Sequence, residues 1–173
     1  MKRFVVYKEH MMKKAMLSLA TVLLTLSLTA CQKTYETPEA LVEQARAGFS
    51  DRETEIKYAG RCDRDTSALL WFISGGETEG YQYIPLECTV RDGGLVFERS
   101  FKAMERGVDI AVMQWRDGYS FLINNESCHV LKITDGLGTH ELAVDEYPYI
   151  WYNETLPLEY VFLDENGNEL RSF

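Results

Sequence analysis

Residues 81–101, YQYIPLECTVRDGGLVFERSF, carry the pattern that decides the fold. Two runs rich in β-branched and aromatic residues, 81–90 and 95–101, stand on either side of Asp-Gly-Gly at 92–94. Asp-Gly pairs tolerate the positive φ angles that tight hairpin turns require. In the second run Leu95, Phe97 and Phe101 share one side of the strand and Glu98 and Ser100 share the other, which is the period of a strand with one buried face. The stretch therefore predicts an antiparallel hairpin.

The same pattern of short apolar runs and turn residues continues on both sides of this hairpin. The intervals between runs are too short for crossover helices, so the strands must pair in an antiparallel sheet. Turn pairs such as Asp117-Gly118 and Asp135-Gly136 separate the runs. Further strands are predicted at 54–58, 67–74, 108–115, 119–123, 128–134, 140–144, 148–152, 158–163 and 169–173.

One segment ahead of the strands has a helical period instead. Thr37-Pro38-Glu39 offers a hydroxyl cap, a proline at the first turn and an acid near the positive end of the dipole. Apolar residues then recur at Leu41, Val42, Ala45 and Phe49. We therefore expect an α+β domain at 37–173, in which one N-terminal amphipathic helix packs on a long, curved antiparallel meander of about 8–10 strands.

Composition and charge exclude several classes of protein. The chain has 173 residues, 46% of them hydrophobic, which is enough for one globular domain and too apolar for disorder. The net charge is −9, and nine acids stand against Arg171 alone from Ile133 to the end of the sequence. Nucleic acids and anionic headgroups need clustered Lys and Arg, so we expect no nucleic-acid partner.

The N-terminal region has the features of an export signal. Lys13 and Lys14 precede an uncharged, leucine-rich stretch at 15–30, which is shorter than a membrane span of about 20 apolar residues. The stretch ends in Leu28-Thr29-Ala30-Cys31. This motif resembles the lipobox of bacterial lipoprotein precursors. The resemblance covers residues 12–31 and implies that a diacylglyceryl group is attached to the thiol of Cys31, and that the chain is then cleaved before that residue.

This resemblance gives the expected organisation of the chain. Residues 1–30 are the signal peptide, and 31–36 are the lipidated cysteine with a short linker to the domain at 37–173. The signal is complete from Met12, so we expect residues 1–11 to be a misassigned start. The partner implied first is the membrane, reached through a lipid anchor, with the domain facing outside the cytoplasm.

The remaining cysteines suggest a disulfide more than catalysis. Cys88 alternates in phase with apolar neighbours and reads as a buried thiol. Cys62 and Cys128 lie beside polar residues, so we expect any disulfide of the exported domain to join these two. A nucleophilic cysteine needs a base, and the adjacent residues Cys128 and His129 point to opposite faces of a strand. A pairing of Cys62 or Cys128 with His140 stays open.

Metal and cofactor motifs are absent from the sequence. The acidic stretch at 164–169 superficially resembles a calcium loop, but its glycine stands at the fourth position and no acid follows at the twelfth. Two histidines without ligand spacing do not predict zinc. We therefore expect no metal and no cofactor.

Aromatic residues beside acids give the candidate binding site. Tyr147, Tyr149 and Trp151 share one face of a predicted strand, and Glu154 follows them. Aromatic side chains with polar tips next to carboxylates suit a sugar ring or a basic peptide. Core packing of a curved sheet also accounts for aromatic residues on strands.

The sequence favours a binding function over catalysis. We expect a membrane-anchored extracytoplasmic lipoprotein whose small domain binds an unidentified protein, peptide or carbohydrate. Two alternatives remain open. One is an envelope enzyme that uses a cysteine or carboxylates, and the other is an accessory or inhibitory subunit that docks on a membrane complex through an exposed sheet edge.

Overall fold

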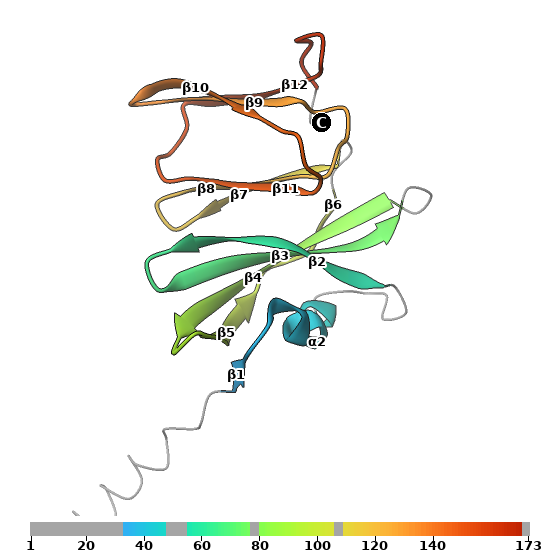
Figure 1. Cartoon of the computed structure of the whole chain (residues 1–173), viewed down its shortest axis with the longest axis vertical. Helices are drawn as coiled ribbons and strands as arrows, with labels where there is room; N and C mark the ends of the chain where they lie inside the picture. Colours follow the sequence, from blue (N-terminus) through green and yellow to red (C-terminus); the bar gives the residue numbers. More distant parts are fainter. Residues whose placement is uncertain (1–32, 48–54, 77–79, 106–108, 171–173) are drawn as a thin grey trace, which may run out of the picture. The chain divides into compact units, whose positions relative to one another are not determined.

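The computed structural model describes residues 33–47, 55–76, 80–105 and 109–170. Strands hold 61% of these residues, and every strand pairing among them is antiparallel. The described residues from Thr34 onward form one compact unit. The predicted signal peptide and Cys31 lie outside the described residues. Figure 1 shows the strands gathered into three sheets.

The first sheet has six strands in the order β1-β5-β4-β3-β2, with β6 paired to β4. The β4–β5 hairpin turns where the sequence predicts: Asp92 and Gly93, with φ of 51° and 80°, connect the two strands. The strands are β1 (Thr34–Tyr35), β2 (Ile56–Arg64), β3 (Ser67–Gly76), β4 (Gly80–Arg91), β5 (Gly94–Ser100) and β6 (Met104–Glu105).

The second and third sheets have three strands each and take their strands from interleaved parts of the chain. The second has the order β11-β8-β7 and the third the order β10-β9-β12. Because β11 returns to β8 and β12 returns to β9, neither sheet is a simple meander. The strands are β7 (Ile110–Trp115), β8 (Gly118–Ile123), β9 (Val130–Asp135), β10 (Gly138–Ala143), β11 (Tyr149–Asn153) and β12 (Glu159–Leu163).

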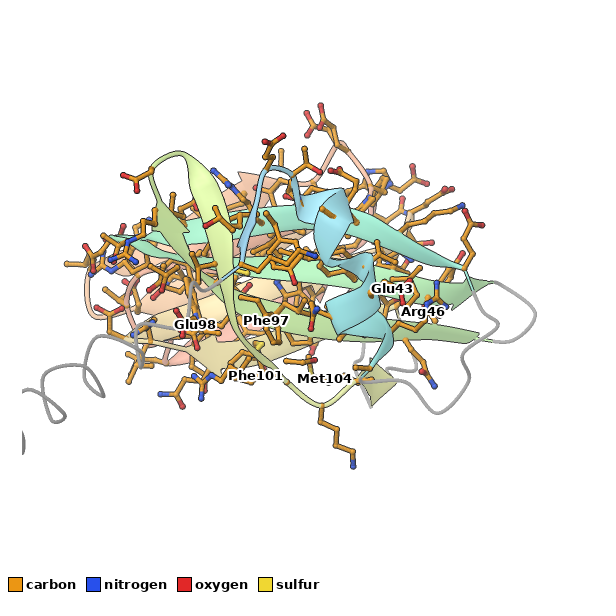
Figure 2. The ribbon with its side chains drawn as sticks, turned by 90° about the horizontal axis from the view of Figure 1, so that it is seen from below. Glu43, Arg46, Phe97, Glu98, Phe101 and Met104 are labelled. Carbon is orange, nitrogen blue, oxygen red and sulfur yellow. The ribbon has the colours of Figure 1, made fainter. Side chains whose placement is uncertain are left out.

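The helical part of the described chain is short. A 3₁₀ turn, η1 (Pro38–Leu41), runs into the five-residue helix α2 (Val42–Arg46). Figure 2 shows this segment in front of the first sheet, where Glu43 and Arg46 of α2 form an ion pair of 3.3 Å. Its buried side chains are Leu41 and Ala45. The 3₁₀ start and the few buried residues explain why no longer amphipathic helix forms in this segment.

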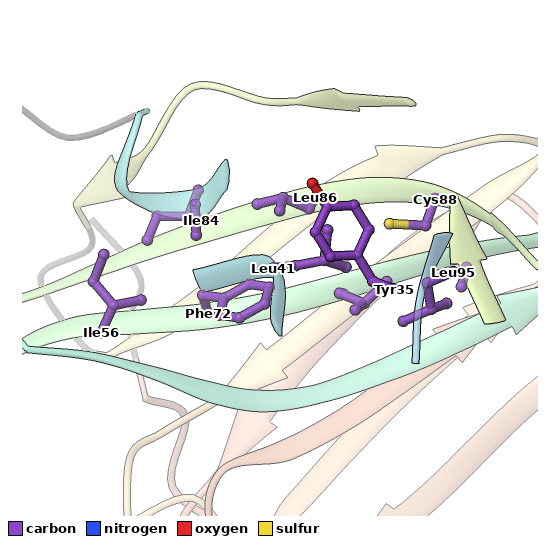
Figure 3. Packing of buried hydrophobic residues seen from close by; sticks show 11 residues of the cluster. Tyr35, Leu41, Ile56, Phe72, Ile84, Leu86, Cys88 and Leu95 are labelled. Atoms are coloured by element: carbon purple, nitrogen blue, oxygen red, sulfur yellow. The ribbon is translucent and has the colours of Figure 1, made fainter. Parts of the chain in front are cut away.

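Three buried hydrophobic clusters fill the spaces between the layers. The first joins the helical segment to one face of the first sheet, and Figure 3 shows Leu41 and Phe72 within it. The second cluster lies between the other face of that sheet and the second sheet, and it includes Trp71 and Leu122. The third lies between the second and third sheets. Adjacent residues of β3 serve opposite clusters, as the period of a strand buried on both faces requires.

The predicted α+β class, with an amphipathic helix packed on one long meander, is therefore wrong. The described chain is mostly β, with nine helical residues. Phe49, the last apolar position of the predicted helix, lies outside the described residues. The meander divides because β11 and β12 pair with strands that precede them by more than one hairpin, which alternation alone does not reveal.

Candidate functional site

A buried carboxylate organises one end of the third sheet. Asp135 ends β9, and its side chain is only 3% exposed. One carboxylate oxygen accepts hydrogen bonds from the hydroxyl of Thr155 and the amide of Asn153, and the other accepts one from the backbone N–H of Leu137 at 2.8 Å. The Thr155 hydroxyl, followed by the Leu137 N–H, lowers the pKa of Asp135 to about 2.

These bonds fix two loops beside each other. The β9–β10 turn carries Leu137, and the β11–β12 connection carries Thr155, so Asp135 ties both to one point. The backbone N–H of Leu158 donates to Thr134 at 2.8 Å, which holds the end of the second loop on β9. Figure 1 shows the two connections at the same end of the sheets. The loops are therefore arranged before any ligand arrives.

The fixed loops present apolar side chains to solvent. We call Leu137, Leu156 and Leu158 the leucine surface; their exposed fractions are 80%, 53% and 79%. Trp151 on β11 and Tyr160 on β12, each 37% exposed, complete the exposed large hydrophobic residues of the described chain. All five come from residues 137–160. Grouped exposed apolar residues mark interaction sites more often than scattered ones do.

Acidic side chains accompany this apolar surface. Glu154, Glu159 and Glu141 are exposed, and the sequence from 133 to 170 contains no Lys or Arg. Glu154 forms an ion pair of 3.0 Å with Arg64 of β2, and Glu141 forms one of 2.9 Å with Lys132. The local charge is negative, so the surface attracts cationic groups and repels anionic ones.

The structure separates the four predicted binding residues into two pairs. Tyr147 and Tyr149 are half-buried and pack against the cluster between the second and third sheets. The Tyr147 hydroxyl donates to the carbonyls of Cys128 and Val144, at 2.6 and 3.2 Å. Both tyrosines therefore hold the sheets together in this structure. An aromatic run on a strand is compatible with either role, so the sequence alone did not separate them.

The other two predicted residues lie at the surface. Trp151 pairs with Phe121 on β8, and its indole is partly exposed, whereas the indoles of Trp71 and Trp115 are buried. Glu154 is exposed beside the leucine surface and bound to Arg64. The role of the three leucines could not be predicted from the sequence, because single leucines in turns have no periodic pattern. The signal available was Leu-Pro-Leu at 156–158, an apolar triplet that a proline keeps out of a strand interior.

The three cysteines among the described residues are free thiols. Cys62 lies in the cluster between the first and second sheets and Cys128 in the cluster between the second and third, so the predicted disulfide does not form in the structure. Burial raises the pKa of both thiols to about 11, and that of Cys88 to about 12. These thiols are therefore protonated at neutral pH, which does not favour a nucleophilic role.

A second buried carboxylate joins two sheets. Glu87 on β4 accepts hydrogen bonds from Arg99 at 2.7 Å and from the Trp115 indole at 3.1 Å, and Arg116 lies 2.6 Å away. Burial alone raises the pKa of Glu87, but these donors and positive charges lower it below its usual range. Because Arg99 and Arg116 neutralise this carboxylate and Trp115 donates a hydrogen bond to it, Glu87 has the environment of a structural ion pair.

A separate cavity of about 310 Å³ opens between the first sheet and the start of β11. Tyr81, Asn124 and Pro148 line it, with Lys57 among the charged residues. None of the four predicted binding residues lines this cavity. Its volume is at the lower end of small-molecule sites.

The described part of the chain contains no cluster of His, Cys, Asp and Glu that could hold a metal ion. No helix among the described residues has the length and apolar character to cross a membrane. The chain matches no protein-family model, and neither a curated protein nor a solved structure matches it.

Proposed function

We propose that this protein is a lipid-anchored lipoprotein of the cell envelope whose β domain binds a partner protein through the leucine surface. The partner offers apolar and basic side chains. The observation that carries the proposal is the grouping of every exposed large hydrophobic residue of the described chain within residues 137–160, a segment with acids and no Lys or Arg before residue 171.

The proposed partner follows from the chemistry of this surface. Three leucines on fixed loops offer apolar contact area without the entropic cost of ordering the loops on binding. The exposed carboxylate of Glu159 and the excess of acids at 133–170, a segment that has no Lys or Arg, favour a cationic partner. Free carbohydrate fits less well, since the exposed aromatic residues of the described chain are Trp151 and Tyr160, each only 37% exposed.

The proposed location rests on the lipobox resemblance at 28–31. A lipid anchor at Cys31 keeps the domain near the membrane, so the partner is an envelope protein. Radiolabelled palmitate should enter the native protein, and Cys31→Ser should abolish this labelling. A native protein without label, or one whose first residue is not Cys31, would contradict the location without affecting the leucine surface.

Binding is tested with a synthetic ten-residue peptide of alternating lysine and leucine. Trp151 reports the contact, because Trp71 and Trp115 are buried and the sequence has three tryptophans. We expect the peptide to change the emission of the purified protein, and a peptide of alternating glutamate and leucine to have no effect. Trp151→Phe should remove the signal, which assigns it to that residue.

Charge reversal provides the matched pair for this test. Glu159→Lys, next to Leu158, should weaken binding of the lysine-leucine peptide severalfold. Glu36→Lys makes the same change at an exposed position before the helical segment and should leave binding unchanged. Equal affinity for the two peptides, or an equal effect of the two substitutions, would disprove binding through the leucine surface.

A further inference from the structure

The edge strand of the third sheet has backbone groups that point away from its neighbour. β10 pairs with β9 alone among the described strands. The N–H of Val144 donates to His129 at 2.9 Å, in the same register as the β9–β10 ladder. In an antiparallel pair, hydrogen-bonded and non-hydrogen-bonded positions alternate. Residues 138, 140 and 142 are therefore bonded to β9, and the N–H and C=O of Thr139, Glu141 and Ala143 point outward.

This edge is open to solvent. All residues of β10 except Leu142 are exposed. The side chains of Thr139 and Glu141 contact β9, where the Thr139 hydroxyl lies 3.1 Å from that of Thr134 and Glu141 pairs with Lys132. These contacts lie across the face of the sheet toward β9, so they leave the backbone groups at the edge uncovered.

Two other edges, those of β12 and β2, carry features that discourage pairing. The chain after β12 folds back on it, through the bridge between Leu163 and Glu169 and a bond of 2.8 Å from the Leu170 N–H to Phe162. β2 has an irregular register between Tyr58 and Gly60, and it carries Lys and Arg side chains. Such coverage, bulges and basic residues are the usual protection of an edge. The sequence of β10, GTHELA, has no proline and no lysine, and its register is regular.

We infer that β10 is a strand-pairing site, at which an extended basic segment of the partner protein adds to the third sheet through the backbone of Thr139, Glu141 and Ala143. This inference rests on the proposed function, because Leu137 of the leucine surface directly precedes β10. Strand addition supplies affinity through main-chain hydrogen bonds, and the alternate side chains supply specificity.

Charge determines the type of strand that fits. Glu141 already pairs with Lys132 at 2.9 Å, so the preference rests on the segment around the edge, which has nine acids and no Lys or Arg from 133 to 170. A second copy of this chain, paired through its own β10, would bring a second acidic segment to the same edge. Like charges brought together in this way are destabilising. A basic strand of another protein is therefore the occupant.

The test measures backbone amides by residue-resolved hydrogen exchange with the same lysine-leucine peptide. In the free protein the amides of Thr139, Glu141 and Ala143 should exchange fast, and those of His140 and Leu142 slowly. At saturating peptide the three outward amides should slow at least tenfold, and the inward amides should not change. Fast exchange at these amides in the bound protein would overturn the inference.

A proline at an outward position provides a second test. Ala143→Pro removes an N–H that β9 does not use, so the hairpin keeps its ladder. We expect about fivefold weaker peptide binding from the loss of one hydrogen bond. Ala143→Val retains the N–H and should bind as the wild type does. Thr139→Pro repeats the test at a second outward amide, in case the first variant does not fold.

The outcomes separate this inference from the proposed function. A peptide that changes Trp151 emission but protects none of the outward amides would show docking on the leucine surface without strand pairing. Protection of the amides without any effect of Glu159→Lys or of the leucine substitutions would show strand pairing without the leucine surface. If neither signal responds to the peptide, both proposals are wrong.

Discussion

The first and third sheets of this protein are both antiparallel but are covered differently. The first sheet has a buried cluster on each face, and β3 is buried along most of its length. The third sheet packs one face on the second sheet, and β10 and its turn stay exposed. The first sheet thus provides stability, whereas the third has surface available for a partner. A leucine has a different role in each.

The largest expected effect comes from a leucine of the first sheet. Leu86 on β4 is fully buried in the cluster beneath the helical segment. Leu86→Ala should lower the free energy of unfolding by about 2–5 kcal/mol, because it leaves a cavity that the surrounding strands fill only partly. Urea unfolding of the purified protein measures the change. A loss below about 1 kcal/mol would show that this layer is loosely packed.

The second effect concerns the ionic contact between the first and second sheets. Glu87→Gln keeps the size of the side chain but removes the charge that Arg99 and Arg116 neutralise. We expect a loss of about 1.5–3 kcal/mol, the usual range for hydrogen bonds to a charged group. Both arginines are partly exposed, so solvent reduces the loss toward the lower value.

Glu98→Gln on the neighbouring strand is the matched control for this measurement. Glu98 is exposed and accepts a hydrogen bond of 2.9 Å from Thr89. Surface substitutions of this kind usually change stability by less than about 0.5 kcal/mol. Equal effects at the two positions would contradict a structural role for the Glu87 contacts.

The sequence was most informative about local features. The predicted strand at 95–101 is β5 within one residue, because side-chain alternation and the Asp92-Gly93 turn are both local. The division into three sheets could not be predicted, since the pairing of β11 with β8 depends on contacts between distant residues. The prediction of a longer amphipathic helix was wrong for a related reason. Its apolar period was present, but among the described residues only Leu41 and Ala45 are buried, with Val42 partly buried against the same cluster.

The candidate site shows the same limit. Trp151 and Glu154 lie at the surface, as a binding role requires, but Tyr147 and Tyr149 pack between sheets. The sequence does not indicate whether a tyrosine hydroxyl will donate its hydrogen bond to water or to a backbone carbonyl. Here Tyr147 meets the carbonyl of Cys128. The strand predicted at 158–163 begins with Leu158, whereas β12 begins at Glu159. The side chain of Leu158 is therefore exposed to solvent.

A smaller effect on stability is expected when low pH protonates Asp135 and weakens its hydrogen bonds at the end of the third sheet. The folded-state pKa of Asp135 is about 2, below its unfolded value of about 3.9. Its contribution to stability is therefore present above pH 4 and is lost as pH falls through about 2. The stability difference between the wild type and Asp135→Asn should shrink over this interval. A difference that stays constant between pH 6 and pH 2 would contradict the role of the charged form.

The smallest effect on stability, and the largest on binding, is expected at Leu158. Leu158→Ala makes the same chemical change as Leu86→Ala, but its side chain is already 79% exposed. Removing it takes little apolar area out of a buried state, so the free energy of unfolding should change by less than about 0.5 kcal/mol. Affinity for the lysine-leucine peptide should fall at least fivefold, the loss that a central contact residue causes. A variant that is destabilised by more than about 1 kcal/mol would mean that Leu158 packs against the domain in solution, and the leucine surface would then belong to the core of the third sheet.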